Sequence, residues 1–260
     1  MLIEQKEKYI SSLINLWHKV FGDEEEYIRL FFKEAYFDGE CFVAEIDGEV
    51  VSAFYLLKSA IKCDGKAFEG RYLYAAATLP EYRGQGLMSK LINEALDYVR
   101  EEKLDFIALV PADDGLYDYY SRFGFYESMY KYKYTTENNA STMRAYREIY
   151  DSKEFSAIRN SSSCDMLIYN DICNRYAFEC LNYGGIRVFY LNDNSYYAEG
   201  EELFCDDVDS AINLINNLSG ESVIYTNCRL EKAEKIRNGM IYHFNDELKN
   251  KEIYMNIALD

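Results

Sequence analysis

The stretch TLPEYRGQGLMSKL, residues 78–91, decides how the rest of this 260-residue chain is interpreted. An apolar segment precedes it and an amphipathic one follows, so we expect a strand, a turn at Gly84 and Gly86, and a helix from about Leu87. Glycine permits a tight turn and leaves backbone N–H groups accessible. A helix N-terminus adds unpaired N–H groups and a partial positive charge. With the cation of Arg83 and the hydroxyl of Ser89, this arrangement predicts an anion site.

Other interpretations of the two glycines are weaker. A dinucleotide-binding fingerprint requires GxGxxG, and GQGLMS lacks the third glycine. A P-loop requires GK[ST], which does not follow here. The alternative to an anion site is a strand-to-helix turn whose glycines serve geometry alone.

The flanking sequence alternates between helical and extended patterns. Apolar residues recur at helical spacing in the segments 10–20 and 28–32, and Asp47-Gly48 joins two short apolar runs as a hairpin turn would. The later elements are a strand at 69–79, a helix at 87–103, a strand at 105–110, a helix at 114–123 and a strand at 124–134. This order predicts an α/β (α+β) fold with a mixed, mostly antiparallel sheet flanked by helices.

The second half of the chain repeats the order of elements without repeating the letters. Residues 137–163 are polar, end in a serine run and predict a helical linker. We therefore expect one domain at 1–136, the linker at 137–163, and a second lobe at 164–260.

Composition limits the partners. The net charge of −17 repels nucleic acid and anionic lipid and attracts cations. No apolar run reaches about 18 residues and MLIEQKEKYI has no signal-peptide character, so we expect a cytoplasmic protein without membrane contact. Seven cysteines without CxxC spacing and two histidines predict reduced thiols and no metal site.

Two segments resemble motifs of the GCN5-related N-acetyltransferase (GNAT) superfamily. Residues 83–88, RGQGLM, are similar to its Q/R-x-x-G-x-G/A loop, and VPADDGLYDYYSRFGF at 110–125 is similar to its later strand and "LY-x-K-x-GF" helix. In that superfamily the loop holds the pyrophosphate of acetyl-CoA. The resemblance implies acetyl-CoA as cosubstrate and no metal.

The resemblance also implies roles for individual residues. The backbone of the strand before the loop would pair with the pantetheine arm, the loop would hold the phosphates, and Asp113 stands where an asparagine often touches the pantetheine. The implied contacts to acetyl-CoA are made by Ala76, Ala77, Thr78, Arg83, Gly84, Gln85, Gly86, Leu87, Met88, Ser89 and Asp113. Tyr120 matches the tyrosine general acid, and Tyr117 and Tyr119 are its neighbours if the register slips.

The general base stays open between Glu69, Asp113, the terminal carboxylate of Asp260 and a water chain. Glu69 lies about one residue out of register with the superfamily's catalytic glutamate, which turns a strand side chain to the other face. In two-lobed relatives a C-terminal carboxylate reaches the site, whereas here we assign the tail to the second lobe.

Met88 replaces a small residue of the loop motif, as in relatives resembling the enhanced intracellular survival acetyltransferases, which join two acetyltransferase-like lobes. The corresponding junction of the second half, ELFCDDVDSAINL, has no glycine and three aspartates, so we expect a degenerate lobe that binds no phosphate.

The resemblance implies an acetyl-CoA-dependent N-acetyltransferase that acts on a primary amine, either a small cationic amine or a lysine-like side chain. A catalytically silent acyl-CoA-binding or sensing module is the alternative. An aminoacyl transferase of the cell-wall type is disfavoured by the intact loop and the net acidity. The sequence specifies neither the acceptor nor the oligomeric state.

Overall fold

The computed structural model describes residues 1–37, 39–139, 143–145, 164–168, 189–191, 201–203, 219–226 and 234–255. The helices in these ranges are α1 (Lys6–Phe21), α2 (Glu25–Glu34), α3 (Leu87–Glu101) and α4 (Asp114–Ser121), with short 3-10 turns at Pro80–Tyr82 and Asp246–Leu248. The strands are β1 (Glu40–Ile46), β2 (Glu49–Cys63), β3 (Lys66–Thr78), β4 (Phe106–Leu109), β5 (Tyr126–Asn139), β6 (Met143–Ala145), β7 (Cys164–Ile168), β8 (Phe189–Leu191), β9 (Glu201–Leu203), β10 (Ser219–Thr226), β11 (Glu234–His243) and β12 (Tyr254–Met255).

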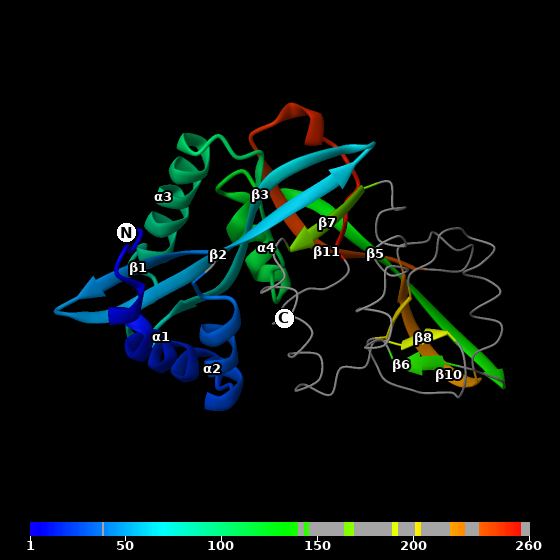
Figure 1. Cartoon of the computed structure of the whole chain (residues 1–260), viewed down its shortest axis with the longest axis horizontal. Helices are drawn as coiled ribbons and strands as arrows, with labels where there is room; N and C mark the ends of the chain where they lie inside the picture. Colours follow the sequence, from blue (N-terminus) through cyan, green and yellow to red (C-terminus); the bar gives the residue numbers. More distant parts are fainter. Residues whose placement is uncertain are drawn as a thin grey trace.

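The described strands other than β6 and β8 form one large mixed sheet (Figure 1). Its order is β12-β7-β2-β3-β4-β11-β5-β10-β9, β1 pairs with β2 beside this path, and β6 pairs with β8 in a separate small sheet. Parallel pairs in the large sheet are β3 with β4, β9 with β10 and β7 with β12, and the other pairs are antiparallel. The expected mixed, mostly antiparallel sheet flanked by helices is confirmed.

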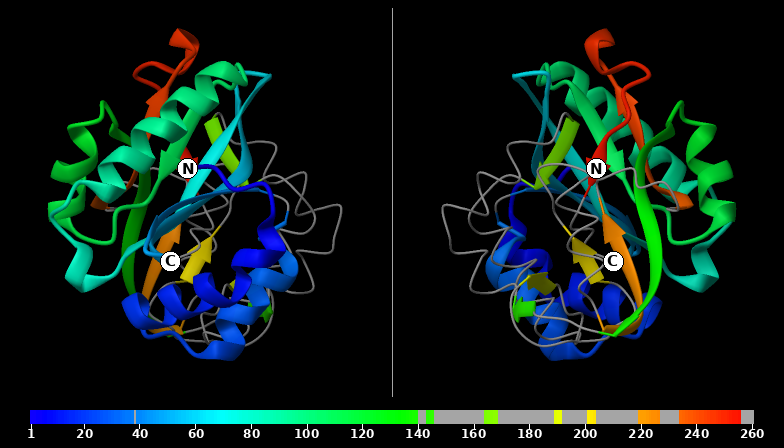
Figure 2. Two further views of the ribbon diagram at one scale, coloured as in Figure 1. Left: turned by 90° about the vertical axis from the view of Figure 1, so that its left-hand side faces the viewer. Right: turned by 90° about the vertical axis from the view of Figure 1, so that its right-hand side faces the viewer.

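Helices cover the two faces of the sheet in pairs (Figure 2). Tyr55 and Leu57 of β2 lie in the apolar cluster that contains buried residues of α1 and α2. Phe54 and Leu56, which alternate with them along the strand, lie in the cluster that contains residues of α3 and α4. The apolar run of β2 is therefore explained by burial on both faces.

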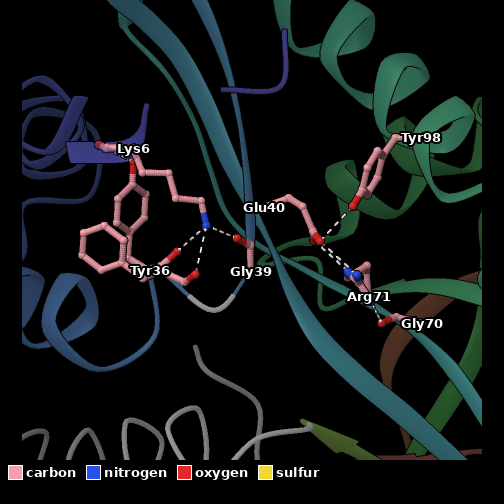
Figure 3. A network of polar contacts seen from close by, with 8 residues as sticks. Lys6, Tyr36, Gly39, Glu40, Gly70, Arg71 and Tyr98 are labelled. Atoms are coloured by element: carbon pink, nitrogen blue, oxygen red, sulfur yellow. Dashed lines mark hydrogen bonds and ion pairs between the residues drawn. The ribbon is translucent and has the colours of Figure 1, made fainter. Parts of the chain in front are cut away.

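A polar network ties β1, β3 and α3 together (Figure 3). Arg71 of β3 donates from Nε and Nη2 to the two carboxylate oxygens of Glu40, at 2.7 and 2.9 Å. The hydroxyl of Tyr98 on α3 donates to the same carboxylate at 2.9 Å. The Glu40 and Arg71 side chains are only 16% and 12% exposed, so the bidentate geometry compensates two charges that have lost much of their water. Nearby, Lys6 of α1 donates to the carbonyls of Tyr36, Phe37 and Gly39.

Two strands of the segment expected to form a second lobe, β7 and β11, lie in the large sheet. β11 pairs antiparallel with β4 on one side and with β5 on the other. β7 pairs with β2, over Cys164–Ile168 and Ser59–Cys63. Both strands thus complete the sheet to which residues 1–136 contribute, because each offers backbone donors and acceptors to an edge that would otherwise be open.

The linker and the second lobe are described only in part. Residues 137–139 and 143–145 of the segment expected to be a helical linker are extended strand, in β5 and β6. Residues 146–163 and much of 164–260 lie outside the described residues, as does Asp260. The domain boundaries at 136 and 163 stay a prediction.

Two further expectations concern the cysteines and the membrane. Cys41 is a free, buried thiol, but Cys63 is disulfide-bonded, so the expectation of reduced cysteines is wrong for Cys63. Within the described ranges, no helix has both the length and the apolar character needed to cross a bilayer.

Candidate functional site

The carboxyl-terminal half of β3 separates from β4 before it reaches the loop. The two strands pair in parallel only from Gly70 to Tyr72 of β3, opposite Phe106 to Ala108 of β4. β3 continues to Thr78, whereas β4 ends at Leu109. Beyond Tyr72, the edge of β3 that faces β4 is no longer hydrogen-bonded to β4. An extended ligand could form backbone hydrogen bonds with that edge, as an added strand would.

A β-bulge lies in this separated half of β3. Ala53 of β2 pairs with Ala77 and Tyr55 pairs with Tyr74, so Phe54 alone faces two residues of β3, Ala75 and Ala76. Ala75 has φ +49°, in the left-handed region that residues with a side chain adopt rarely. A bulge leaves one residue outside the ladder and re-aims the backbone, and such bulges are frequent beside active sites.

The loop between β3 and α3 has the predicted geometry. Gly84 and Gly86 have φ +76° and +77°, and a Cβ added at either would meet nothing within 4 Å. The glycines are thus required for backbone conformation rather than for space within the protein. Gly86 is the N-cap of α3 and supplies no side-chain cap, so the first N–H groups of the helix have no such partner.

Loop side chains hold the turn in place. Arg83 Nε donates to the Thr78 carbonyl at 3.1 Å, and Gln85 Nε2 donates to the Glu81 carbonyl at 3.3 Å. Both Arg83 and Gln85 are exposed, so the cation of Arg83 lies at the surface of the loop. Leu87 and Met88, by contrast, pack against the two apolar clusters. Met88 is therefore accommodated by the core beneath α3, which explains how the loop tolerates a large residue there.

Ser52 of β2 makes hydrogen bonds to the end of β3, a role that the sequence did not predict. Its fully buried hydroxyl donates to the Ala77 carbonyl at 3.0 Å and lies 2.8 Å from the Thr78 hydroxyl. A serine within the otherwise apolar run VVSAFYLL does indicate a buried hydroxyl, and a buried hydroxyl needs a hydrogen-bond partner.

Helix α4 contacts the first turn of α3. The Tyr119 hydroxyl lies 3.0 Å from Ser89 Oγ, which joins the two helices beside the loop. Asp113 is the N-cap of α4, and its Oδ1 accepts a hydrogen bond from the Leu116 N–H at 2.9 Å. This cap explains an acidic residue at position 113 without any ligand.

Tyr120 is buried beneath this contact, at 6% exposure. Its ring packs edge-on against Phe125 and Tyr119, with centroids 5.9 and 5.3 Å away. Burial raises the pKa of Tyr120 above the ordinary tyrosine value, because a phenolate would lose its hydration there. The residue therefore holds its proton at neutral pH. The structure thus brings Ser89, Tyr119 and Tyr120 into one contact chain between α3 and α4.

The candidate general bases do not join this group of Ser89, Tyr119 and Tyr120 in the described residues. The Glu69 N–H donates to the Asp105 carboxylate at 2.8 Å, and the Asp105 N–H donates to the Glu69 carbonyl at 2.7 Å. Glu69 therefore lies at the amino end of β4, whereas α4 begins beyond the carboxyl end of that strand. Its neighbour Gly70 has no room for a side chain, since an added Cβ would lie 2.5 Å from the Phe106 ring. Asp113 is used as a helix cap, and Asp260 lies outside the described residues. Among the described residues, no group of three or more His, Cys, Asp or Glu side chains is arranged to hold a metal ion.

Comparison with known proteins identifies the class. The acetyltransferase (GNAT) domain family matches residues 2–129, which include the bulge, the loop and α4. Residues 2–129 therefore form a GNAT acetyltransferase domain, as the sequence resemblance predicted. No curated protein sequence matches the chain.

Solved structures share the fold over nearly the whole chain at low sequence identity. A probable N-acyltransferase from Enterococcus faecalis has 12% identity and a TM-score of 0.68, over 95% of this chain and 73% of that one. A GCN5-related N-acetyltransferase from Kribbella flavida has 14% identity and a TM-score of 0.66, over 95% and 72%. Eis1 from Mycobacterium abscessus has 9% identity and a TM-score of 0.63, over 94% and 73%. At these identities the likeness concerns the fold.

Proposed function

We propose that the protein is an acetyl-CoA-dependent N-acetyltransferase that transfers the acetyl group directly to a primary amine. The observation that carries the proposal is the bulged, separated end of β3, which runs into a loop with two left-handed glycines and the uncapped start of α3. Such a surface suits an extended pantetheine arm that ends in a pyrophosphate, because backbone N–H groups serve both.

The chain offers groups for the chemical step. A bound thioester would supply the activated acyl group, and the acceptor must be an uncharged amine in order to attack it. The bulge leaves one β3 residue unmatched by β2, and its N–H is our candidate for polarising the carbonyl. Tyr120 is our candidate acid, since it keeps its proton and can donate it to the departing sulfur. The amine's proton leaves to a base or to a water chain.

The net charge of −17 supports a cationic acceptor, either a small amine or a lysine-like side chain. An acidic surface raises the local concentration of cations and disfavours anionic substrates. A silent acyl-CoA-binding module is the second candidate, because Glu69 lies at the far end of β4 from α4 and the Asp113 carboxylate is used to cap α4.

Two measurements separate these candidates. Calorimetry with acetyl-CoA tests donor binding, and absence of binding would refute both candidate functions. Thiol release from acetyl-CoA across a panel of polyamines, amino sugars and lysine peptides then tests transfer. Amine-dependent release supports the enzyme, while binding without release on any acceptor supports the sensing module.

Tyr120→Phe tests the acid. We expect turnover to fall by about 10²-fold, within the range for lost acid–base catalysis, with acetyl-CoA affinity nearly unchanged. Tyr9→Phe is the matched control, because it removes the hydroxyl of another buried tyrosine, which lies on α1 in the other apolar cluster and not on α4. Equal turnover of the Tyr120→Phe variant and the parent would remove Tyr120 from the mechanism.

A further inference from the structure

Arg237 of β11 contacts both α4 and β5 from a part of the chain far away in sequence. Its guanidinium pairs with Asp114, the first residue of α4, and lies 3.0 Å from Glu127 of β5. It also lies over the ring of Tyr117 on α4, with 4.0 Å between Cζ and the ring centroid. The Arg237 side chain therefore contacts the first turn of α4 twice, through an ion pair with Asp114 and through a cation–π contact with the Tyr117 ring.

The backbone of β11 fixes where this side chain starts. The register of β11 on β5 shifts on both sides of Gly239, which marks an irregularity next to Arg237. A Cβ at Gly239 would lie 2.8 Å from the Leu109 carbonyl of β4 and 2.9 Å from the Met129 sulfur of β5. Only glycine fits there, so β11 sits tightly between its two neighbours and the base of Arg237 has little freedom.

Helix α4 is thus held at two places. Arg237 holds its start, and the Tyr119–Ser89 contact holds its last turn against α3. Tyr120 lies next to the second contact and is buried between α4, Phe125 and the apolar cluster beneath α3. With eight residues, α4 is too short to keep its orientation without such contacts.

We propose that Arg237 is a positioning residue, which orients α4 so that Tyr120 meets the acetyl donor. This inference rests on the proposed function, since it assigns Arg237 a role in that same site. Arg237 touches neither the loop nor the β3 bulge, so it acts through α4. A shift of α4 by even one ångström would misplace the proton donor while leaving the phosphate loop intact.

Stability alone does not account for the contact. The Arg237 side chain is 36% exposed and Asp114 is 93% exposed, and ion pairs at such sites contribute little to folding. Their geometry, in which one guanidinium spans two elements, restricts orientation more than it stabilises.

The test compares Arg237→Met, Arg237→Lys and Arg100→Met in the full chain. Arg100 is the matched control, because it also pairs with an aspartate and faces an aromatic ring, but on α3 away from α4. For each variant we would measure the acetyl-CoA Kd, kcat with the best amine, and hydrogen exchange of the α4 amides. For Arg237→Met we expect a loss in kcat of roughly tenfold to a hundredfold, with the Kd within about twofold of the parent. We also expect faster α4 exchange, partial recovery in Arg237→Lys, and parental values in Arg100→Met.

Unchanged α4 exchange in Arg237→Met would overturn the inference, and so would a joint loss of binding and turnover. If Arg237→Met does not fold, Asp114→Asn is measured in the same way, because it removes one arm of the contact at an exposed carboxylate. Unchanged exchange and kcat in that variant would also overturn it. Hydrogen exchange is measured without substrate turnover, so it tests the contact of Arg237 with α4 even in an inactive protein. A parent protein that binds acetyl-CoA but transfers no acetyl group would refute the proposed function and not this contact.

Discussion

Gly86 and Gly22 adopt the same backbone conformation for different reasons. Both have φ +77°, and an added Cβ would meet nothing within 4 Å at either. Gly22 ends α1, where its N–H bonds to the His18 carbonyl. Gly86 starts α3, at the end of the loop that we propose to bind the phosphates. Substitutions at the two positions therefore distinguish the loss of folding stability caused by a side chain in the left-handed region from a loss of ligand affinity.

Gly86→Ala and Gly22→Ala should each lower the free energy of unfolding by about 1 kcal/mol, the cost of a side chain in the left-handed region. We expect only Gly86→Ala to weaken acetyl-CoA binding as well, by about tenfold or more, since the loop N–H groups would be displaced from a charged acceptor. Thermal unfolding and calorimetry on both variants check this. Equal affinity of the two variants for acetyl-CoA would contradict the loop assignment.

At the scale of elements, α3 is held to the sheet by the network of Glu40, Arg71 and Tyr98. An exposed pair with similar chemistry exists on α2, where Arg29 Nε donates to Glu25 at 2.8 Å and both side chains are 62% exposed. The two pairs differ mainly in burial. Breaking a buried pair leaves a charge without compensation, while breaking an exposed pair returns both groups to water.

Arg71→Met should therefore lower the free energy of unfolding by about 3 kcal/mol. Arg29→Met should change it by about 0.5 kcal/mol or less. Urea unfolding at constant pH measures both, and Arg71→Met combined with Glu40→Gln should recover part of the loss. A similar small effect in both single variants would show that solvent compensates Glu40 after all.

At the scale of the whole molecule, β11 makes the first half of the chain dependent on the tail. Met240 and Ile241 belong to the two apolar clusters on opposite faces of the sheet, and Leu248 and Ile253 join one of them. The sheet and both its cores thus include residues that follow position 233.

A chain that stops after residue 233 should lose cooperative unfolding, whereas one that stops after 255 should keep it. The first lacks β11 and leaves the facing edges of β4 and β5 open, while the second retains every described strand. Calorimetric unfolding compares them. The longer variant also tests Asp260, since undiminished acetyl transfer without it would exclude its terminal carboxylate as the base.

Alkaline pH should unfold the protein through its buried tyrosines. Burial raises the pKa of Tyr120 and Tyr55, and burial together with Glu40 raises the pKa of Tyr98 to about 12. Their folded pKa values exceed the unfolded value of about 10, so their contribution is fully present below pH 10 and is lost as pH rises further. Urea midpoints should hold up to about pH 10 and then fall. The fall should be less steep in Tyr120→Phe, and an identical slope would contradict the burial of this phenol.

The sequence predicted the elements whose pattern is local and did not predict those that depend on distant pairing. The loop glycines, α3 and the Asp47-Gly48 hairpin follow from turn chemistry and periodicity, and all appear as expected. The segment LEKAEKIRN, residues 230–238, is typical of a short helix by its residue types, but residues from Glu234 onward are strand because they pair with β5 and then with β4. Ser52 and Arg237 had no motif, since their roles depend on neighbours more than 20 residues away.

The place of β11 also has a consequence during synthesis. β4 and β5 leave the ribosome about a hundred residues before the strand that lies between them, so for several seconds the nascent chain carries two facing edges with nothing to pair. Intervening strands such as β7 and β10 are made during that interval and could occupy the gap out of order. We therefore expect chaperone binding near residues 106–139, or slow translation after them, to change the yield of folded protein.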